Sequence, residues 1–338
     1  MDENQPIQTN EQKIVEEVAR RNYEFDYVSI VLFLFILLGI GLIFSLLTTQ
    51  RGLSPVVEEP GAGGIVEAEP FINPFDSISL DGVAAFVYDV KANEALFAKN
   101  EEMQLPLASI TKLMTVLAAS TYIEENETIT IDYKSLDQEG DSGLFAFEEW
   151  KARDLFDFTL LVSSNDGASV LASVAGGTKV IRTGREGDTP ASAFVDEMNS
   201  LAKQIGLSQT YFINETGLDP NEELSGGYGS ARDTSKLLEY IILNEPRLVE
   251  ATAYTSLDFK SNSNYEHTAT NTNPIIGSIP GLIASKTGFT DLAGGNLVVA
   301  FDAGINRPVI ISVLGSSKDG RFSDIEKLVE ASLELLNK

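Results

Sequence analysis

The sequence contains no cysteine and only one histidine, His267, in 338 residues. Without cysteine, the chain can form no disulfide framework, no cysteine-ligated zinc site and no cysteine nucleophile. One histidine cannot build a multi-histidine metal site, and a Ser-His-Asp triad would have to use His267. The polar, turn-like residues 261–266 before it predict that His267 lies in a loop. We therefore expect a protein without a metal or another cofactor.

Basic residues are scarce, because 24 lysines and arginines stand against 50 aspartates and glutamates, for a formal net charge of −26. Proteins that bind nucleic acid present a basic face, so this balance argues against a nucleic-acid partner. The length allows one large domain, or two small ones, together with appendages.

One long apolar run stands out in the otherwise charge-rich N-terminal region. No charged residue occurs from Tyr27 to Gln50, and residues 27–47 are nearly all apolar or glycine. A helix over these residues would rise about 31 Å, roughly the hydrocarbon thickness of a bilayer. We expect one transmembrane helix over residues 27–49. The run is longer than the usual apolar core of a signal peptide and no cleavage motif follows it promptly, so an uncleaved anchor is favoured.

The basic residues around this run predict its orientation. Lys13, Arg20 and Arg21 precede it, whereas Arg51 alone follows closely. The more basic flank of a membrane span stays in the cytoplasm, so residues 1–26 are expected to form a cytoplasmic tail. The rest of the chain would then lie outside the cell membrane, held by a single-pass anchor.

Beyond the apolar run, the composition changes twice. Residues 50–77 are rich in proline, glycine and glutamate, which favours an extended extracytoplasmic linker. Residues 78–338 carry the patterns of one folded domain, with β-rich runs at both of its ends, at 82–90, 95–99, 282–289, 295–302 and 307–314. These runs predict an α+β fold, in which an antiparallel sheet is built from both ends of the domain, with helices around it and a helical lobe.

Helical patterns fill the middle of the domain and its C-terminal end. An apolar helix is predicted from Ser109 onward, and an amphipathic helix over residues 194–205. Residues 176–191 have the composition of a polar, glycine-rich loop. A capping box of Ser323 and Glu326 is predicted to open the last helix.

Ser109 and Lys112 stand three residues apart, so a helix places both side chains on one face, one turn apart. A serine hydroxyl becomes a good nucleophile when a neighbouring base takes its proton. A lysine amine serves as that base when burial or a second cation makes its proton costly to hold. Because Ser200 and Lys203 have the same spacing, this motif needs support from elsewhere in the chain.

A second candidate motif is Lys286-Thr287-Gly288, which ends an apolar strand pattern. Lys286 offers a cation and Thr287 a hydroxyl, a pair suited to binding a carboxylate. Gly288 has no Cβ, which lets a ligand backbone approach the strand closely.

In chain order, Ser109-x-x-Lys112, Ser163-x-Asn165 and Lys286-Thr287-Gly288 form the signature of the active-site-serine penicillin-recognising enzymes. The residues that flank these motifs closely resemble those of the D-alanyl-D-alanine carboxypeptidases, the low-molecular-mass penicillin-binding proteins. Further stretches resemble the same family, at 212–219, 230–233, 271–273, 314–317 and 321–322. The resemblance covers about residues 78–338 and implies a β-lactamase/transpeptidase-like fold.

The resemblance also implies a reaction, removal of the last D-alanine from a peptidoglycan stem peptide. Ser109 would attack the carbonyl of the penultimate D-alanine and form an acyl-enzyme, with Lys112 as the general base. Ser163 would relay the proton to the leaving nitrogen, and Asn165 would hold Lys112 and the substrate amide.

The family's remaining binding groups fall on one run of this chain, Lys286-Thr287-Gly288-Phe289. Lys286 and Thr287 would bind the terminal carboxylate of the substrate, and Lys286 would help to keep the catalytic lysine neutral. The backbone N–H groups of Ser109 and Phe289 would form the oxyanion hole. β-Lactams would acylate the same serine as covalent inhibitors.

Departures from the family pattern leave alternatives open. Ser164 stands where the family usually has glycine, which would narrow the site. The C-terminal β-domain and anchor helix of many relatives have no expected counterpart after the catalytic domain, and the N-terminal apolar run would replace that anchor. Endopeptidase or transpeptidase action on cross-links remains possible on the same motifs. A β-lactamase is disfavoured by the lack of Glu-x-x-Leu-Asn between the last two motifs, and a catalytically silent wall-binding protein by the intact motif residues.

Overall fold

Strands from both ends of the folded part form one antiparallel sheet, in the order β10-β11-β12-β1-β2. The pairing of β12 with β1 joins the two ends, and it places Val313 opposite Ala85. The predicted α+β architecture, with a sheet built from both ends of the domain, is therefore confirmed. The five strands are β1 (Ala84–Asp89), β2 (Glu94–Lys99), β10 (Leu282–Thr290), β11 (Gly294–Asp302) and β12 (Pro308–Ser316).

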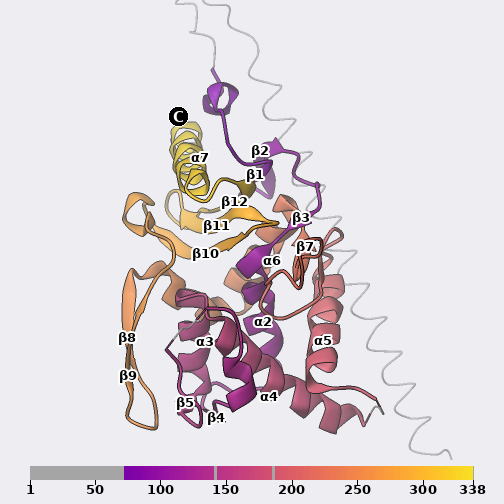
Figure 1. Ribbon diagram of the computed structural model, residues 1–338. Helices are drawn as coiled ribbons and strands as arrows, with labels where there is room; N and C mark the ends of the chain where they lie inside the picture. The colour runs from indigo at the N-terminus through magenta and orange to yellow at the C-terminus, as the bar shows by residue number, and fades with distance from the viewer. Residues whose placement is uncertain (1–71, 141–142, 185–186, 338) are drawn as a thin grey trace, which may run out of the picture. The chain divides into compact units, whose positions relative to one another are not determined.

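Figure 1 shows the computed structural model, which describes residues 72–140, 143–184 and 187–337. The expected cytoplasmic tail, residues 1–26, and the expected transmembrane helix, residues 27–49, lie outside this part of the chain. Within the described residues, no helix is both long enough and apolar enough to cross a membrane.

The two faces of the sheet pack against different helices, because successive side chains of a strand point to opposite faces. Val87 and Val299 face α7 (Gly320–Leu336), where they join one apolar cluster. Phe86 and Val298 face the helical lobe and belong to a second, larger cluster. In Figure 1, α7 lies on one side of the sheet, and α6 and α2 lie on the other.

The helical lobe surrounds one central helix, α2, whose residues from Thr111 to Ala119 are all buried. This burial confirms the interpretation of the apolar run after Ser109 as a core helix. The helices of the lobe are α2 (Thr111–Ser120), α3 (Ala152–Leu161), α4 (Asn165–Thr183), α5 (Pro190–Ile205) and α6 (Ala231–Asn244).

Short elements complete the described part of the chain. The minor strands are β3 (Leu105–Pro106), β4 (Thr128–Thr130), β5 (Glu149–Lys151), β6 (Tyr211–Phe212), β7 (Gly227–Gly229), β8 (Ser256–Lys260) and β9 (Glu266–Thr270). The 3₁₀ turns are η1 (Pro74–Ser77), η2 (Ala108–Ile110), η3 (Tyr133–Leu136), η4 (Pro246–Leu248), η5 (Glu250–Ala253) and η6 (Ile276–Ser278).

The structure corrects the predicted loop over residues 176–191, because α4 continues to Thr183. Gly176 sits where α4 meets the start of α5, and a Cβ there would lie 1.9 Å from the carbonyl oxygen of Pro190. The glycine therefore permits a close helix contact, which the composition of the segment alone does not reveal.

Two further predictions were wrong. The last helix begins at Gly320 rather than at a capping box, and the Ser323 hydroxyl donates to the Gly320 carbonyl within its first turn. His267 lies in β9 rather than in a loop, and its Nε2 is 2.7 Å from Glu148 Oε1. Both side chains are buried, so the single histidine anchors the β8–β9 hairpin to its neighbours.

Candidate active site

Ser109 lies within η2, the turn that leads into α2, and its hydroxyl is 3.0 Å from Lys112 Nζ. The residue before it, Ala108, has a left-handed backbone with φ +49°, a conformation that costs about 1–2 kcal/mol for a residue other than glycine. A neighbouring loop packs against this residue so closely that a Cβ on Gly217 would lie 2.0 Å from the Ala108 carbonyl oxygen.

The Lys112 amine has three neighbours, which are Ser109 Oγ, Asn165 Oδ1 at 2.6 Å and the Thr216 carbonyl oxygen at 2.7 Å. A neutral amine has two N–H donors and one lone pair. If the two N–H groups of neutral Lys112 donate to the oxygens of Asn165 and Thr216, the lone pair of the amine faces the Ser109 hydroxyl. The Lys112 side chain is fully buried, and this burial lowers the pKa of its amine to about 7, while the Glu215 carboxylate acts in the opposite direction.

Ser163 and Asn165 reach this cluster from the turn before α4 and from its first residue. Ser163 has a left-handed backbone, with φ +61°. Its Oγ lies 2.8 Å from Lys286 Nζ, which donates to it. Asn165 is held at both ends of its amide, since its Nδ2 donates to the Glu139 carbonyl at 2.7 Å.

Ser164, the departure from the family pattern, is the N-cap of α4. Its buried hydroxyl accepts the Gly167 N–H at 2.8 Å. N-cap hydroxyls stabilise helices by roughly 0.5–2 kcal/mol relative to alanine. The structure therefore gives this serine a helix-capping role.

Lys286, on β10, carries the second buried amine of the cluster. Its Nζ donates to Ser163 Oγ and to the Thr287 carbonyl, each at 2.8 Å. Burial holds the pKa of this amine well below its ordinary value, and the charges of Lys112 and Arg321 act in the same direction. Repulsion between two ammonium groups is mutual, so the pair gives up a proton more readily than an isolated lysine.

Thr287 and Gly288 follow on the same strand. Thr287 Oγ1 lies 2.5 Å from Thr272 Oγ1. A Cβ on Gly288 would lie 2.8 Å from the Leu107 carbonyl oxygen and 3.2 Å from Ser109 N. The absence of a side chain here thus lets the chain's own η2 turn approach β10, in addition to any ligand.

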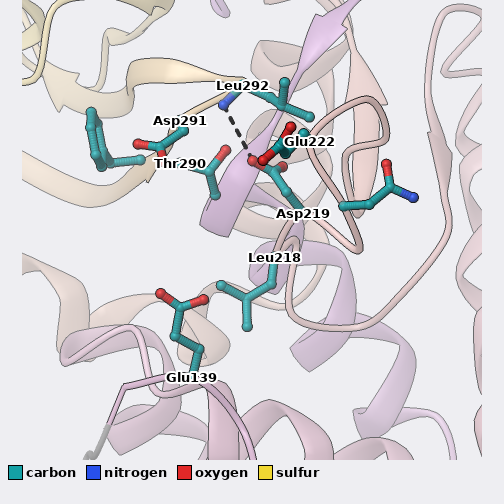
Figure 2. A pocket seen from close by; sticks show the side chains of 9 residues that line it. Glu139, Leu218, Asp219, Glu222, Thr290, Asp291 and Leu292 are labelled. Atoms are coloured by element: carbon teal, nitrogen blue, oxygen red, sulfur yellow. Dashed lines mark hydrogen bonds between the residues drawn. The ribbon is translucent and has the colours of Figure 1, made fainter.

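Figure 2 shows the side chains that line a pocket of about 460 Å³. The pocket is lined in part by Phe289, which follows Gly288 on β10. Two further lining residues are joined by a hydrogen bond, in which the Leu292 N–H donates to Asp219 Oδ2 at 3.2 Å. Four of its lining residues are acidic, which gives the pocket a negative potential. The lining residues are Glu139, Leu218, Asp219, Asn221, Glu222, Phe289, Thr290, Asp291 and Leu292.

The structure thus brings together all three sequence motifs: Ser109 contacts Lys112, Lys112 contacts Asn165, and Ser163 contacts Lys286. The alternative pair on α5 does not join them. Ser200 Oγ instead accepts from Gln204 Nε2 on the exposed face of that helix. In the described part of the chain, no group of histidines and acids is arranged to hold a metal ion.

Sequence reasoning missed three groups that contact the motifs. They are the Thr216 carbonyl beside Lys112, Thr272 beside Thr287, and Arg321, whose Nη1 donates to the Gly288 carbonyl at 2.5 Å. Each lies in a stretch that resembles the penicillin-binding proteins, and that resemblance was the one signal for them. The distance along the sequence between each of these three groups and the motif that it contacts gives no sign of the contact.

Comparison with known proteins gives concordant results. Residues 73–318 match the family described as D-alanyl-D-alanine carboxypeptidase. The chain is similar to D-alanyl-D-alanine carboxypeptidase DacB2 of Mycobacterium tuberculosis, with 30% identity over 260 residues, 75% of this chain and 82% of the relative. It is also similar to the D-alanyl-D-alanine endopeptidase of Escherichia coli, with 29% identity over 253 residues, 72% of this chain and 75% of that one.

Among solved structures, penicillin-binding protein D2 of Listeria monocytogenes, in its cefotaxime-bound form, is similar with a TM-score of 0.61 and 30% identity. The similarity covers 75% of this chain and 98% of that one. The described part of this chain therefore has the antiparallel-sheet and helix fold of penicillin-binding proteins.

Proposed function

This chain belongs to the D-alanyl-D-alanine carboxypeptidase family, and on that premise we propose that it removes the terminal D-alanine from peptidoglycan stem peptides through an acyl-enzyme on Ser109. The observation that carries this proposal is the 3.0 Å approach of Lys112 Nζ to Ser109 Oγ, in a site where the amine is fully buried.

In the first step, the Lys112 amine takes the proton of the Ser109 hydroxyl as its oxygen attacks the carbonyl of the penultimate D-alanine. Asn165 and the Thr216 carbonyl keep the amine oriented, because they accept its two N–H groups. Negative charge develops on the substrate oxygen, and the N–H groups of Ser109 and Phe289 are proposed to stabilise it.

In the second step, the C–N bond breaks and the leaving nitrogen receives a proton. Ser163 is proposed to relay to that nitrogen the proton that Lys112 took from Ser109, which returns the Lys112 amine to its neutral form; the Ser163 hydroxyl also accepts a hydrogen bond from Lys286 Nζ. Lys286 and Thr287 are proposed to hold the terminal carboxylate of the substrate. Water then hydrolyses the ester on Ser109, with Lys112 as base, and frees the shortened peptide.

A second candidate function is hydrolysis of peptide cross-links. The similarity to an Escherichia coli protein named D-alanyl-D-alanine endopeptidase supports it. The two reactions share every step at Ser109 and differ in the group that leaves. β-Lactams are proposed as covalent inhibitors in either case, because they present a strained amide to the same serine; the similar Listeria protein is described with cefotaxime and ampicillin bound.

We also propose that residues 27–49 anchor the protein in the cell membrane, with residues 1–26 in the cytoplasm and residues 78–338 outside, joined by the linker 50–77. The uncharged run and the basic residues before it support this topology. Stem peptides lie outside the membrane, so the topology puts the site and its substrate in the same compartment. Proteolysis of intact and permeabilised cells tests it: a catalytic domain digested only after permeabilisation would contradict it.

The central test is covalent labelling of the full chain in detergent by a fluorescent penicillin, together with release of D-alanine from a D-Ala-D-Ala peptide. Ser109→Ala is expected to abolish both. Ser200→Ala removes the serine of the alternative pair on α5 and should change neither. Persistent labelling of Ser109→Ala would reject the site, and labelling without release of D-alanine would favour the endopeptidase reaction.

A further inference from the structure

Arg321, the second residue of α7, is the one arginine in the described part of the chain that is buried. Its guanidinium donates from Nη1 to the Gly288 carbonyl at 2.5 Å. The side chain passes Gly295 on the neighbouring strand, where a Cβ would lie only 3.2 Å from Arg321 Cδ. The fold thus places a permanent cation on one particular peptide group of the motif strand.

The orientation of that peptide group follows from the strand ladder. β10 is an edge strand with β11 on one side, and its register with β11 is continuous from Ala284 to Thr290. The Ser285 N–H donates to Thr252 Oγ1, which belongs to η5 and not to β11. Backbone groups alternate along a strand, so the Phe289 N–H, four residues on, also points away from β11.

The Gly288 carbonyl and the Phe289 N–H are opposite ends of one planar peptide group. Since the N–H points away from β11, the carbonyl points toward β11, which is the side from which Arg321 approaches. The N–H end faces the free edge of β10, where the packing of Gly288 places Ser109 N close by. These are the two N–H groups that the proposed function assigns to the oxyanion.

We infer that Arg321 is a positioning residue of the oxyanion hole, which acts through the Gly288–Phe289 peptide group. This inference rests on the proposed function. A charge-assisted hydrogen bond on the carbonyl fixes the tilt of the peptide plane and polarises its N–H toward the substrate oxygen. The donor is then already oriented when negative charge develops on the substrate, which is the condition for effective transition-state stabilisation.

Two other roles for a buried arginine make different predictions. If Arg321 bound the substrate carboxylate directly, its loss would affect only ligands that carry a carboxylate. If Arg321 were merely structural, its loss would lower stability without changing the hydrogen bonds at an acyl carbonyl. The experiment therefore needs a ligand pair that differs in the carboxylate and a probe of the acyl carbonyl itself.

The experiment compares the unmodified full chain with Arg321→Met. Acylation rate constants are measured with benzylpenicillin and with its methyl ester, which lacks the carboxylate. Infrared difference spectra of the acyl-enzyme, made with a ¹³C-labelled β-lactam carbonyl, report the hydrogen bonds at the acyl oxygen. Lys318→Met is the matched control, because it removes a cation 5.4 Å from the Phe289 ring, whereas the Gly288 carbonyl is bonded by Arg321.

Losing a whole oxyanion donor costs about 100- to 1,000-fold in rate, so a mispositioned donor should cost about 10- to 100-fold. We expect that loss for both ligands in Arg321→Met, with the acyl carbonyl band moved to higher wavenumber. Lys318→Met should stay within about twofold, with an unmoved band. If Arg321→Met does not fold, Arg321→Lys takes its place and should show a smaller loss and a smaller band shift, since its cation is kept but its planar fork is lost.

Three outcomes overturn the inference: a loss confined to the carboxylate-bearing ligand, an unmoved carbonyl band, or rates equal to those of the unmodified chain. Failure of the proposed function looks different, because the unmodified chain would then form no acyl-enzyme at all.

Discussion

The acidity of the Lys112 amine leads to a quantitative prediction for the rate of acylation. An ordinary lysine with the reference pKa of 10.5 is neutral in only about three molecules in ten thousand at pH 7. With burial lowering the pKa to about 7, half of the molecules carry the neutral base at that pH. The fold thus raises the population of the reactive form by about a thousandfold.

The second-order rate constant for acylation by a penicillin reports ionisations of the free enzyme. It should rise about tenfold per pH unit below pH 7, bend near pH 7, and at pH 5 stand near one hundredth of the value for fully neutral Lys112. The direction follows from the cause, because burial disfavours the ammonium form and acid restores that form. Stopped-flow labelling between pH 5 and 9 at constant ionic strength measures the profile.

The Glu215→Gln substitution should shift the midpoint of this pH profile in a known direction. The Glu215 carboxylate raises the pKa of the Lys112 amine, so its removal should move the midpoint downward. The displacement should be less than about one pH unit, since this carboxylate is partly exposed and solvent screens it. Glu266→Gln, on the exposed β9 edge, should leave the midpoint in place. A flat profile, or a midpoint near pH 10, would refute Lys112 as the buried base.

Three more predictions concern the same site. Thr287→Val should lower kcat/KM for a D-Ala-D-Ala peptide by about 10- to 100-fold, the value of a hydrogen bond to a charged group. Thr268→Val, on the β8–β9 hairpin, should leave kcat/KM unchanged. Equal kinetics for the two variants would contradict the proposal that Thr287 binds the carboxylate. Lys112→Met should abolish labelling yet stabilise the fold by about 2 kcal/mol at pH 6, because the cost of holding a proton on the buried amine, about 5 kcal/mol, exceeds the value of the lost hydrogen bonds, about 3 kcal/mol. The gain in stability should shrink as pH rises from 7 toward 10.5, where the native amine is neutral in the folded chain. Urea unfolding that shows the variant to be less stable than the unmodified chain at pH 6 would contradict this prediction. A peptide with a free amine near the acidic pocket of Figure 2 should react faster than its acetylated counterpart at low salt, and the difference should fall as salt rises; identical rates would show that the pocket's charge does not act on substrate.

That strands from both ends of the domain build one antiparallel sheet was predictable, because β-rich runs lie at both of its ends. The limits of the helices were less predictable. Gly176 looked like part of a loop because glycine is a poor helix former, but it lies inside α4, where the absence of a Cβ allows the close contact with Pro190. His267 looked like a loop residue because its neighbours in sequence are polar, whereas its partner in space is the distant Glu148.

Sequence alone determined which residues could react. The absence of cysteine excluded a cysteine nucleophile, and three ordered motifs that resemble those of a known family named Ser109, Ser163 and Lys286. These conclusions depend on residue type and spacing, which a linear chain displays directly.

Only the tertiary structure decided what state those groups are in. The low pKa of Lys112 comes from burial by segments far away in the chain, and the Thr216 carbonyl and Asn165 reach it from two of them. The orientation of the Phe289 N–H depends on a strand ladder and on Arg321, 33 residues after the carbonyl that it contacts. Desolvation and hydrogen-bond geometry are properties of neighbours in space, so they exist only once the chain has folded.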